Sequence, residues 1–270
     1  MSFVNLSIII ATWNTADTTL KCVQSIKKYL PVFDYEIIVV DNGSSDDTVA
    51  KLKKESGVVI VENKTNLGFG GGNNIGAKVA KGEYLLFLNS DMELLDNKLI
   101  DMFNYINSHP EIGLISPKFL NIDLSDQGSV FPPQTLLNAF KEFWLGQNTY
   151  SKYVPVGKQP VEVFSVSGGA VMIKGSLFEK IGGWDKRYFM FYEDLELCRQ
   201  VKKLSYEIYY YPECRIIHRH GASGKSLADD SNQWRRLIPG SKIYHGIIKH
   251  YLLFLITWSG QKWQKLFYKK

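Results

Sequence analysis

The stretch YLLFLNSDMEL, residues 84–94, is apolar for its first five positions and then turns polar at Asn89, Ser90 and Asp91. A continuous apolar run of this length predicts a strand that is buried on both faces of a sheet. Asn, Ser and Asp after a strand are also typical of a simple turn, and taken alone the turn is the better interpretation. The role of Asp91 therefore depends on what the rest of the chain brings to the end of this strand.

Strands and helices alternate along the first 95 residues. We predict strands at residues 6–12, 35–41, 58–64 and 83–92, and helices at residues 14–30, 48–55 and 75–82. The predicted strands are almost continuously apolar, which is the pattern of a parallel sheet that helices cover on both faces. The segment TNLGFGGGNN, residues 65–74, is expected to be a glycine-rich loop. This half of the chain predicts a Rossmann-like α/β fold.

Polar side chains follow three of the predicted strands, at the carboxyl end of each. They are Thr12 and Asn14, then residues 41–47, then residues 89–91. In open α/β sheets, ligands bind just outside these strand ends. Asp41 could accept a hydrogen bond from a nucleobase N–H or a ribose hydroxyl, although the sequence DNGSSD also predicts an Asx turn there. Residues 1–95 are therefore interpreted as a nucleotide-binding half.

Four glycines, at positions 68, 70, 71 and 72, precede a predicted helix, an arrangement that can cradle a phosphate. The dinucleotide fingerprint G-x-G-x-x-G is not met, because Asn73 stands where the third glycine would be, and a G-K-[ST] motif is absent. The alternative is a turn in which two backbone segments approach each other closely.

The later part of the chain contains two further groups of candidate functional residues, one acidic and one of histidines. EDLELCRQVKKL, residues 193–204, predicts a helix that opens with Glu193 and Asp194. Acids are common in a first helical turn because the helix dipole favours them, but the preceding aromatic run RYFMFY would also partly desolvate a general base. His218 and His220 follow a strand-like segment, and either could be structural or could add to a carboxylate metal site. Residues 110–161 are expected to hold loops and short strands.

The composition is that of an ordinary globular protein, with 45% hydrophobic and 22% charged residues. Cys22, Cys198 and Cys214 are too few and too widely spaced for a disulfide framework or a zinc site, so we expect the reducing cytoplasm. The opening residues MSFVNLSIII lack the positive segment of a signal peptide. The run YLLFLITW, residues 251–258, is too short to span a bilayer, which takes ~20 residues.

Positive charge is concentrated near the C-terminus. Residues 231–270 hold eight Lys or Arg, eight aromatic residues and no Asp or Glu, which leaves 24 bases against 27 acids in residues 1–230. A basic aromatic helix suits packing on the domain with its lysines in water, or binding to an anionic membrane surface, and the two are compatible. Nucleic acid is not expected as a partner, because residues 1–230 are mildly acidic.

Five motifs in this order resemble glycosyltransferase family 2, and within it the bacterial rhamnosyltransferase-like branch that builds surface polysaccharide. The motifs are SIIIATWN (7–14), IIVVDNGSSDDT (37–48), NLGFGGGNNIGAKVAKGEYLLFLNSDMEL (66–94), SGGAVMIKGSLFEKIGGWDKRYFMFYEDLELCRQ (167–200) and IHRHGAS (217–223). The resemblance covers residues 5–225 and implies the GT-A fold. It implies a domain of residues 1–225, with a nucleotide-binding half (1–95) and an acceptor and catalytic half (96–225). A basic aromatic helical tail (226–270) follows.

The resemblance also implies a role for each motif. Asp41 would hold the base, with Thr12 and Asn14 nearby; Asn66, Gly70, Gly71, Asn73, Asn89 and Ser90 would line the nucleotide sugar; Asp91 and His218 would bind Mn²⁺ or Mg²⁺; and Asp194, with Glu193 as the next candidate, would be the catalytic base. Asn89 departs from the family pattern, which has Asp at this position. A neutral amide is expected to bind a metal more weakly than a carboxylate does.

The implied reaction is the inverting transfer of a sugar. The expected donor is dTDP-L-rhamnose, with a UDP-hexose as the alternative, and the expected acceptor is a glycan or a saccharide on a membrane lipid. A nucleotidyltransferase would carry a glycine-rich loop near the first strand, and ATWNTAD, residues 11–17, has none. A catalytically silent sugar-nucleotide binding module is the other alternative. We expect a cytoplasmic enzyme that can lie on the inner face of the cell membrane.

Overall fold

The computed structural model describes residues 4–219 and 233–267. Within them, ten strands form one mixed sheet with the order β3-β2-β1-β4-β11-β6-β12-β5, to which β7 and β9 add at β6 and β12. The strands are β1 (Leu6–Thr12), β2 (Tyr35–Asp41), β3 (Val58–Glu62), β4 (Tyr84–Leu88), β5 (Met92–Leu94), β6 (Ile112–Leu120), β7 (Asp126–Gln127), β8 (Val130–Phe131), β9 (Val161–Glu162), β10 (Ser165–Val166), β11 (Ala170–Lys174) and β12 (Glu207–His218). β8 and β10 pair separately.

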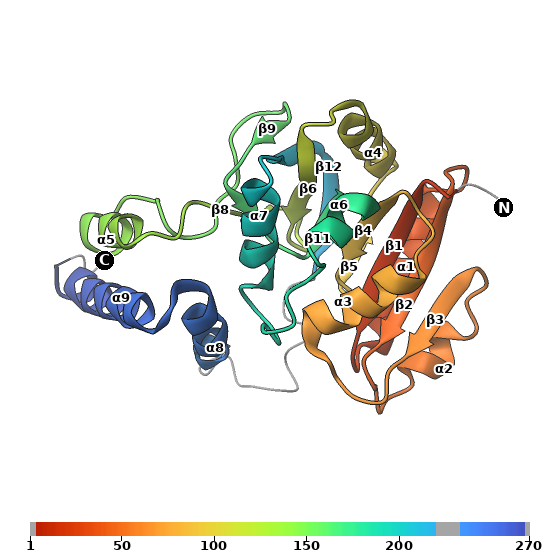
Figure 1. Ribbon diagram of the computed structural model, residues 1–270, viewed down its shortest axis with the longest axis horizontal. Coiled ribbons are helices and arrows are strands. Elements are labelled where there is room, and N and C mark those ends of the chain that lie inside the picture. The colour runs from red at the N-terminus through yellow and green to blue at the C-terminus, as the bar shows by residue number, and fades with distance from the viewer. Residues whose placement is uncertain (1–3, 220–232, 268–270) are drawn as a thin grey trace.

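Helices cover both faces of the sheet (Figure 1). They are α1 (Ala16–Tyr29), α2 (Thr48–Leu52), α3 (Gly68–Val79), α4 (Lys98–Ser108), α5 (Leu136–Leu145), α6 (Gly175–Lys180), α7 (Glu193–Lys203), α8 (Gln233–His245) and α9 (Ile247–Phe267). The predicted helices at residues 14–30, 48–55 and 193–204 correspond to α1, α2 and α7. The domain boundary predicted at residue 225 lies outside the described residues.

The parallel half of the sheet follows the sequence prediction. β1 pairs in parallel with β2 and with β4, and β2 pairs in parallel with β3. In β1, Ile8 and Ile10 face one hydrophobic core, which includes residues of α1 and α4. Ile9 faces a second core on the other side of the sheet, which includes residues of α6 and α7. Burial on both faces explains why the strand is continuously apolar, and the predicted α/β fold is confirmed.

The second half of the sheet is mixed. β11 lies between β4 and β6 and is antiparallel to both, whereas β6 and β12 are parallel to each other. The prediction of loops and short strands in residues 110–161 was wrong in two places, because β6 is nine residues long and α5 lies in the same region. Every residue of β6 except Lys118 is buried. Its Gly113, Ser116 and Pro117 weaken the local strand signal, and the neighbouring strands compensate.

The predicted glycine-rich loop is helical, which corrects the sequence-based expectation. α3 begins at Gly68, so the following glycines lie in its first turns. A Cβ atom on Gly70 would lie 2.9 Å from Cβ of Trp184, and a Cβ atom on Gly72 would lie 2.7 Å from Nδ2 of Asn42. Glycine is unfavourable inside a helix. Close packing of α3, and not loop flexibility, therefore explains these glycines.

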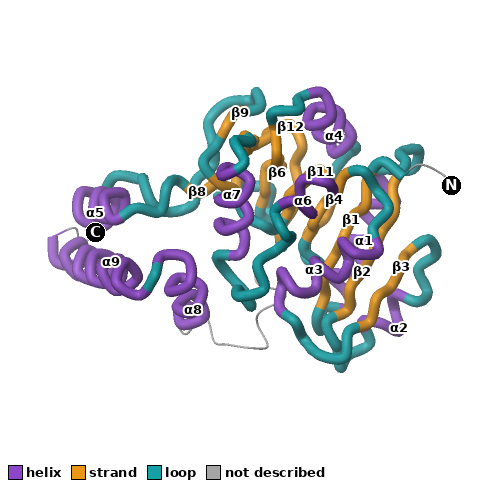
Figure 2. Tube along the Cα trace, in the orientation of Figure 1, coloured by secondary structure: helices purple, strands orange, loops and turns teal. Residues whose placement is uncertain are grey.

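The C-terminal segment forms two helices that extend away from the sheet, with α9 beside α5 (Figure 2). Gly246, with a φ of +79°, separates α8 from α9. The indole N–H of Trp144 in α5 donates to the carbonyl oxygen of Ile256 at 3.2 Å, and Gly260 lies against Phe143. The predicted helical tail is confirmed. Among the described residues, no helix combines the length and the apolar character needed to cross a membrane.

Candidate active site

A cleft of about 250 Å³ opens at the carboxyl ends of β1 and β4. Its walls also include the start of α3, the loop that leads into α7, and one side chain of α8. The predicted site residues that line it are Thr12, Asn66, Asn89, Ser90, Asp91, Glu193, Asp194 and His218. The structure therefore brings together side chains that are more than 200 positions apart, at the strand ends where a ligand was expected.

Asp91 and His218 form a pair at one end of the cleft. Residues 89–91 make the turn between β4 and β5, and Asp91 is only 3% exposed. Its Oδ1 lies 3.5 Å from Nε2 of His218. Nδ1 of His218 lies 2.6 Å from the amide oxygen of Gln127. Because that oxygen can only accept, Nδ1 donates, and in the neutral ring Nε2 directs its lone pair toward Asp91.

This pair fits a divalent cation. The Oδ1 atoms of Asp91 and Asn89 are buried and accept no hydrogen bond within the described residues. An unpaired buried carboxylate oxygen is costly, and a cation beside it would remove that cost. Mg²⁺ commonly binds one or two protein carboxylates and completes its shell with water and substrate phosphates. Residues 4–219 and 233–267 contain no group of three or more His, Cys, Asp or Glu placed to hold a metal, so the protein would supply only part of the shell.

Asp41 lies at the end of β2, outside the set of residues that line the cleft. Its Oδ2 accepts hydrogen bonds from the backbone N–H groups of Gly43 at 3.1 Å and Ser44 at 3.0 Å, so the predicted Asx turn is present. Its Oδ1 is buried and accepts no hydrogen bond within the described residues. The turn explains one oxygen and leaves the other available for a ligand N–H. The next residue, Asn42, lines the cleft and was missed by the sequence prediction.

Asn14 and Asn66 fix backbone around the cleft. The side-chain oxygen of Asn14, a residue with a φ of +52°, accepts from the N–H of Ser45 at 2.8 Å. The side-chain oxygen of Asn66 accepts from the N–H of Gly68 at 2.9 Å, at the start of α3. Asn66 lines the cleft and Asn14 does not. These hydrogen bonds to the backbone explain, from local structure alone, why an asparagine stands at each of the two positions.

Thr12 and Ser90 belong to a buried hydroxyl network beneath the cleft. The hydroxyl of Thr12 lies 2.8 Å from that of Thr15 and 2.7 Å from that of Thr19. Ser90 joins the network through Thr15, at 3.2 Å. The network ties the start of α1 to the β4–β5 turn and so helps to hold the turn that carries Asp91.

Gly70, Gly71 and Asn73 lie in α3 and are not among the residues that line the cleft. A Cβ atom on Gly71 would lie 2.8 Å from Cβ of Leu67. Asn73 is fully buried, and neither atom of its amide has a hydrogen-bond partner within the described residues. Their place beside the nucleotide sugar, predicted for a loop, stays a prediction for residues that lie in a helix and outside the cleft lining. His220, the alternative metal ligand, lies outside the described residues.

The acids at the start of α7 face the cleft. Phe191 and Tyr192, which precede them, have φ angles of +70° and +71°. This left-handed conformation is uncommon for aromatic residues, and it turns the aromatic run into the helix. Oδ1 of Asp194 accepts from the N–H of Leu195 at 2.8 Å, and its Oδ2 accepts from the N–H of Gly168 at 3.2 Å. Asp194 thus has a fixed orientation.

Glu193 has a different environment from Asp194. It is 7% exposed, and its Oε2 has no hydrogen-bond partner within the described residues. Burial, followed by the charge of Asp194, raises the pKa of Glu193, and the nearby Lys152 opposes this shift. A buried carboxyl that keeps its proton is a poor acceptor for another. Of the two acids, Asp194 is therefore the better candidate for a general base.

Sequence reasoning missed two cations that line the cleft, Lys152 and Arg236. Lys152 comes from the irregular segment after α5, and no sequence motif surrounds it. Arg236 comes from α8, and only the positive charge of the tail pointed to this part of the chain. Both reach the cleft through tertiary contacts that a local pattern does not encode.

Comparison with protein families decides the classification. The model described as Glycosyl transferase family 2 matches residues 7–181, which is more than half of the chain. The chain belongs to glycosyltransferase family 2. The resemblance seen in the motifs is thereby confirmed. The matched residues include Asp91 and end before Asp194 and His218, so the roles of those two residues rest on their geometry.

Two bacterial relatives of this family 2 chain have names that refer to O-antigen biosynthesis and to an L-rhamnosyltransferase. The O-antigen biosynthesis protein RfbC of Myxococcus xanthus is 26% identical over 85% of this chain, which spans only 18% of RfbC. The N-acetylglucosaminyl-diphospho-decaprenol L-rhamnosyltransferase of Mycobacterium tuberculosis is 24% identical over 69% of this chain and 67% of its own length. The crystal structure of GalNAc-T7 with UDP, GalNAc and Mn²⁺ matches 81% of this chain and 44% of GalNAc-T7, with a TM-score of 0.67 and 17% identity. This likeness confirms the GT-A fold.

Proposed function

We propose that this protein is an inverting glycosyltransferase that moves a sugar from a nucleoside diphosphate donor to a saccharide acceptor. One observation carries the proposal: the buried Asp91–His218 pair and the hydrogen-bonded Asp194 line the same cleft. The pair suits a metal-held diphosphate, and Asp194 suits a base. Oδ1 of Asp41, which accepts no hydrogen bond from the part of the chain that the structure describes, adds an acceptor for a pyrimidine N–H near the same strand ends.

In the proposed reaction, Asp194 accepts the proton of the acceptor hydroxyl as that oxygen attacks the anomeric carbon. The attack comes from the face opposite the nucleotide, so the new C–O bond forms as the bond to the diphosphate breaks, and the configuration inverts. The N–H groups of Gly168 and Leu195 hold Asp194 in place for this transfer. General base catalysis of this kind contributes about 10²–10⁴ in rate. Phe189 and Phe191 line the same wall and help to exclude water.

Asp91 and His218 would hold the divalent cation, Mn²⁺ or Mg²⁺, and Asn89 would add a neutral oxygen. When bound, the cation would neutralise charge that develops on the leaving diphosphate. The chain's own contribution is to fix these ligands. The N–H of Arg219 donates to the carbonyl oxygen of Asp91 at 2.9 Å, and Gln127 orients the ring of His218.

We infer dTDP-L-rhamnose as the donor. Support comes from the mycobacterial relative, whose name assigns rhamnosyl transfer to a lipid diphosphate sugar. A UDP-hexose presents an equivalent pyrimidine and diphosphate and is the alternative donor. A sugar-nucleotide binding module without turnover would bind the donor equally well, so turnover has to be measured directly.

We infer that the acceptor is a saccharide on a membrane lipid, and that the enzyme acts at the inner face of the cell membrane. α9 supports this location, because one of its faces exposes large apolar side chains to solvent. They are Ile247, Ile248, Tyr251, Phe254, Leu255, Trp258 and Leu266. Residues 233–267 contain no Asp or Glu, and Lys262 and Lys265 are exposed along the same helix. Such a helix lies in a membrane interface and does not cross it.

The proposal is tested in two steps. Calorimetry with dTDP-rhamnose, UDP-glucose and UDP-N-acetylglucosamine, with and without Mn²⁺, identifies the donor. The preferred donor is then incubated with N-acetylglucosamine on a prenyl diphosphate, and the product is analysed by mass spectrometry and by NMR of the anomeric centre. We expect a glycoside of inverted configuration. Donor binding without product would contradict the enzymatic proposal, and a retained configuration would contradict the mechanism.

A further inference from the structure

Lys152 and Arg236 are the cations in the cleft that the proposed mechanism does not use. The ammonium group of Lys152 lies 3.4 Å from the Ser167 hydroxyl and 4.7 Å from the centroid of the Phe131 ring. The guanidinium of Arg236 donates to the sulfur of Met190 at 3.2 Å and lies 5.8 Å from the centroid of the Phe191 ring. Within residues 4–219 and 233–267, neither cation pairs with a carboxylate in the way that Arg219 pairs with Glu93.

Both cations border the wall that carries the base. Ser167, the neighbour of Lys152, directly precedes Gly168, whose N–H binds Asp194. Met190 and Phe191, the neighbours of Arg236, lead directly into α7. Neither cation contacts Asp91 or His218 in the described structure. The acceptor hydroxyl must approach Asp194, so these cations lie where the acceptor enters.

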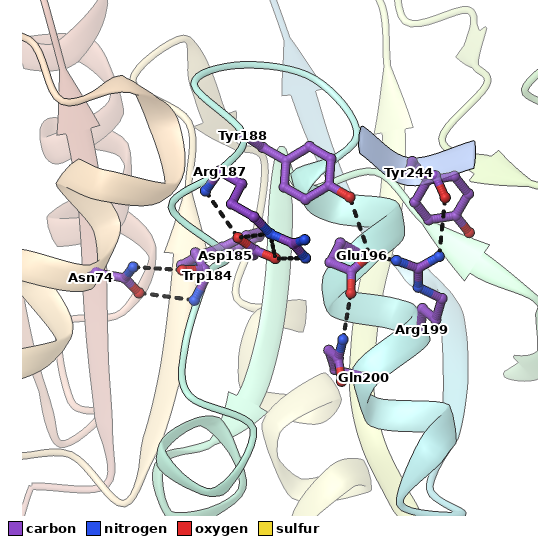
Figure 3. Close-up of polar contacts among 9 residues, drawn as sticks. All are labelled: Asn74, Trp184, Asp185, Arg187, Tyr188, Glu196, Arg199, Gln200 and Tyr244. Atoms are coloured by element: carbon purple, nitrogen blue, oxygen red, sulfur yellow. Dashed lines mark hydrogen bonds and ion pairs between the residues drawn. The ribbon is translucent and has the colours of Figure 1, made fainter. Parts of the chain in front are cut away.

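The position of Arg236 is built into the packing of α8. Gly240 lies so close to the loop before α7 that a Cβ atom on it would be 2.5 Å from the carbonyl oxygen of Phe191. Arg199 of α7 donates to the carbonyl oxygen of Tyr244 at 3.2 Å and lies 4.5 Å from the centroid of its ring. Figure 3 shows the hydrogen bond to Tyr244, together with the ion pair between Arg199 and the buried Glu196. α8 is therefore fixed to the element that carries the base.

We propose that Lys152 and Arg236 form a subsite for the diphosphate of a lipid-linked acceptor, which places its sugar hydroxyl at Asp194. Two cations that form no ion pair with a carboxylate in the described part of the chain match a doubly charged diphosphate. The same α8 leads through Gly246 into α9, whose exposed apolar face suits the membrane that would hold the lipid. The inference rests on the proposed function, because it assumes that Asp194 receives the acceptor.

The donor's diphosphate is the other source of the same chemistry, and a binding experiment separates the two. The donor subsite is first filled with dTDP and Mn²⁺, and geranyl diphosphate is then titrated in by calorimetry, with geraniol as the control for the chain alone. We expect the wild-type protein to bind geranyl diphosphate under these conditions. Lys152→Gln and Arg236→Gln should each weaken this binding about tenfold to a hundredfold, the usual effect of losing a charge-assisted hydrogen bond, and leave dTDP affinity unchanged. Arg235→Gln is the matched control, because Arg235 lies on the same helix and outside the cleft lining.

Three outcomes would overturn the subsite: loss of geranyl diphosphate binding once dTDP is present, weaker dTDP binding in the variants, or an equal effect of Arg235→Gln. In turnover, Arg236→Gln should reduce kcat/KM for a prenyl diphosphate acceptor much more than kcat/KM for the corresponding octyl glycoside, and an equal reduction for both acceptors would also contradict the subsite. The binding measurement needs no catalysis. A protein that transfers no sugar would therefore refute the proposed function, and the geranyl diphosphate titration would still decide the subsite.

Discussion

Asp194→Asn separates the chemistry of the base from its structural role. The asparagine oxygen can keep the 2.8 Å hydrogen bond from the Leu195 N–H. The amide NH₂ then takes the place of Oδ2, which in the wild type accepts from the Gly168 N–H at 3.2 Å. Two donors then face each other, so one hydrogen bond to a carboxylate is lost and the Gly168 N–H is left without its partner, at about 1–3 kcal/mol. Loss of the base itself should lower the rate about 10²–10⁴-fold, which corresponds to a barrier higher by roughly 3–5 kcal/mol. The effect on turnover should thus exceed the effect on folding.

Glu193 provides an internal check on this prediction. The charge of Asp194 is one of the causes that raise the pKa of Glu193. In Asp194→Asn that cause is gone, so the pKa of Glu193 should fall and a larger fraction of Glu193 should be ionised. Residual activity in the variant should therefore increase with pH, and it should disappear in the double variant that also carries Glu193→Gln.

The measurement is a kcat and KM determination across pH for wild type, Glu193→Gln, Asp194→Asn and the double variant, with donor affinity from calorimetry and thermal melting as controls. We expect unchanged donor affinity, a small change in melting temperature and a large fall in kcat for Asp194→Asn. Turnover within threefold of wild type, in a variant that binds the donor normally, would remove Asp194 from the mechanism.

Three other perturbations give distinct readouts. Asp91→Ala should weaken both Mn²⁺-dependent nucleoside diphosphate binding and activity about 10–100-fold, and His218→Ala should weaken them somewhat less. Binding is measured by calorimetry at several Mn²⁺ concentrations. Activity that changes neither with these substitutions nor with a chelator would contradict a metal site. The folded-state pKa of Glu193 is raised above its ordinary value of 4.5, so its contribution to stability is fully present below pH 4.5 and is lost as pH rises through the raised value. Glu193→Gln should therefore gain stability relative to wild type between pH 5 and 9, measured by chemical denaturation. Parallel plots of the free energy of unfolding against pH for the two proteins would refute this. Replacing Lys262 and Lys265 with Gln should weaken binding to anionic vesicles about 30-fold, since each lysine is worth ~1 kcal/mol, while neutral vesicles bind both proteins equally. Equal binding of the two proteins to anionic vesicles would exclude a membrane role for these lysines.

The parallel half of the fold could be predicted because its strands carry their own signal. β1 and β4 are buried on both faces, so each is a continuous apolar run that needs no knowledge of its partners. β6 and β12 depend on neighbours that are distant in sequence, and β11 joins β4 in the antiparallel sense after a gap of more than 80 residues. Local patterns carry no information about such pairings, which explains why β6 was missed.

The same distinction applies to the cleft. The strand-end position of Asp91 follows from the apolar run before it, and the position of Asp194 follows from the helix that it opens. The left-handed turn that directs Asp194 is not visible in the sequence RYFMFY, because aromatic residues rarely adopt positive φ. Lys152 and Arg236 could not be predicted, since only the packing of α8 and of the segment after α5 brings them to the cleft.

The environment of Asn89 offers a physical reason for its departure from the family pattern, which has Asp at this position. Its Oδ1 is buried and, like the nearby Oδ1 of Asp91, accepts no hydrogen bond within the described residues. An aspartate at position 89 would place two buried carboxylates in one turn, and without a cation their repulsion and desolvation would oppose folding. The amide keeps an oxygen available as a ligand and adds no charge. In the proposed metal site the amide would weaken the affinity for a divalent cation, but it leaves Asp91 as the only carboxylate in residues 89–91. The proposed cation and donor diphosphate would then bind together at a β4–β5 turn that is already formed.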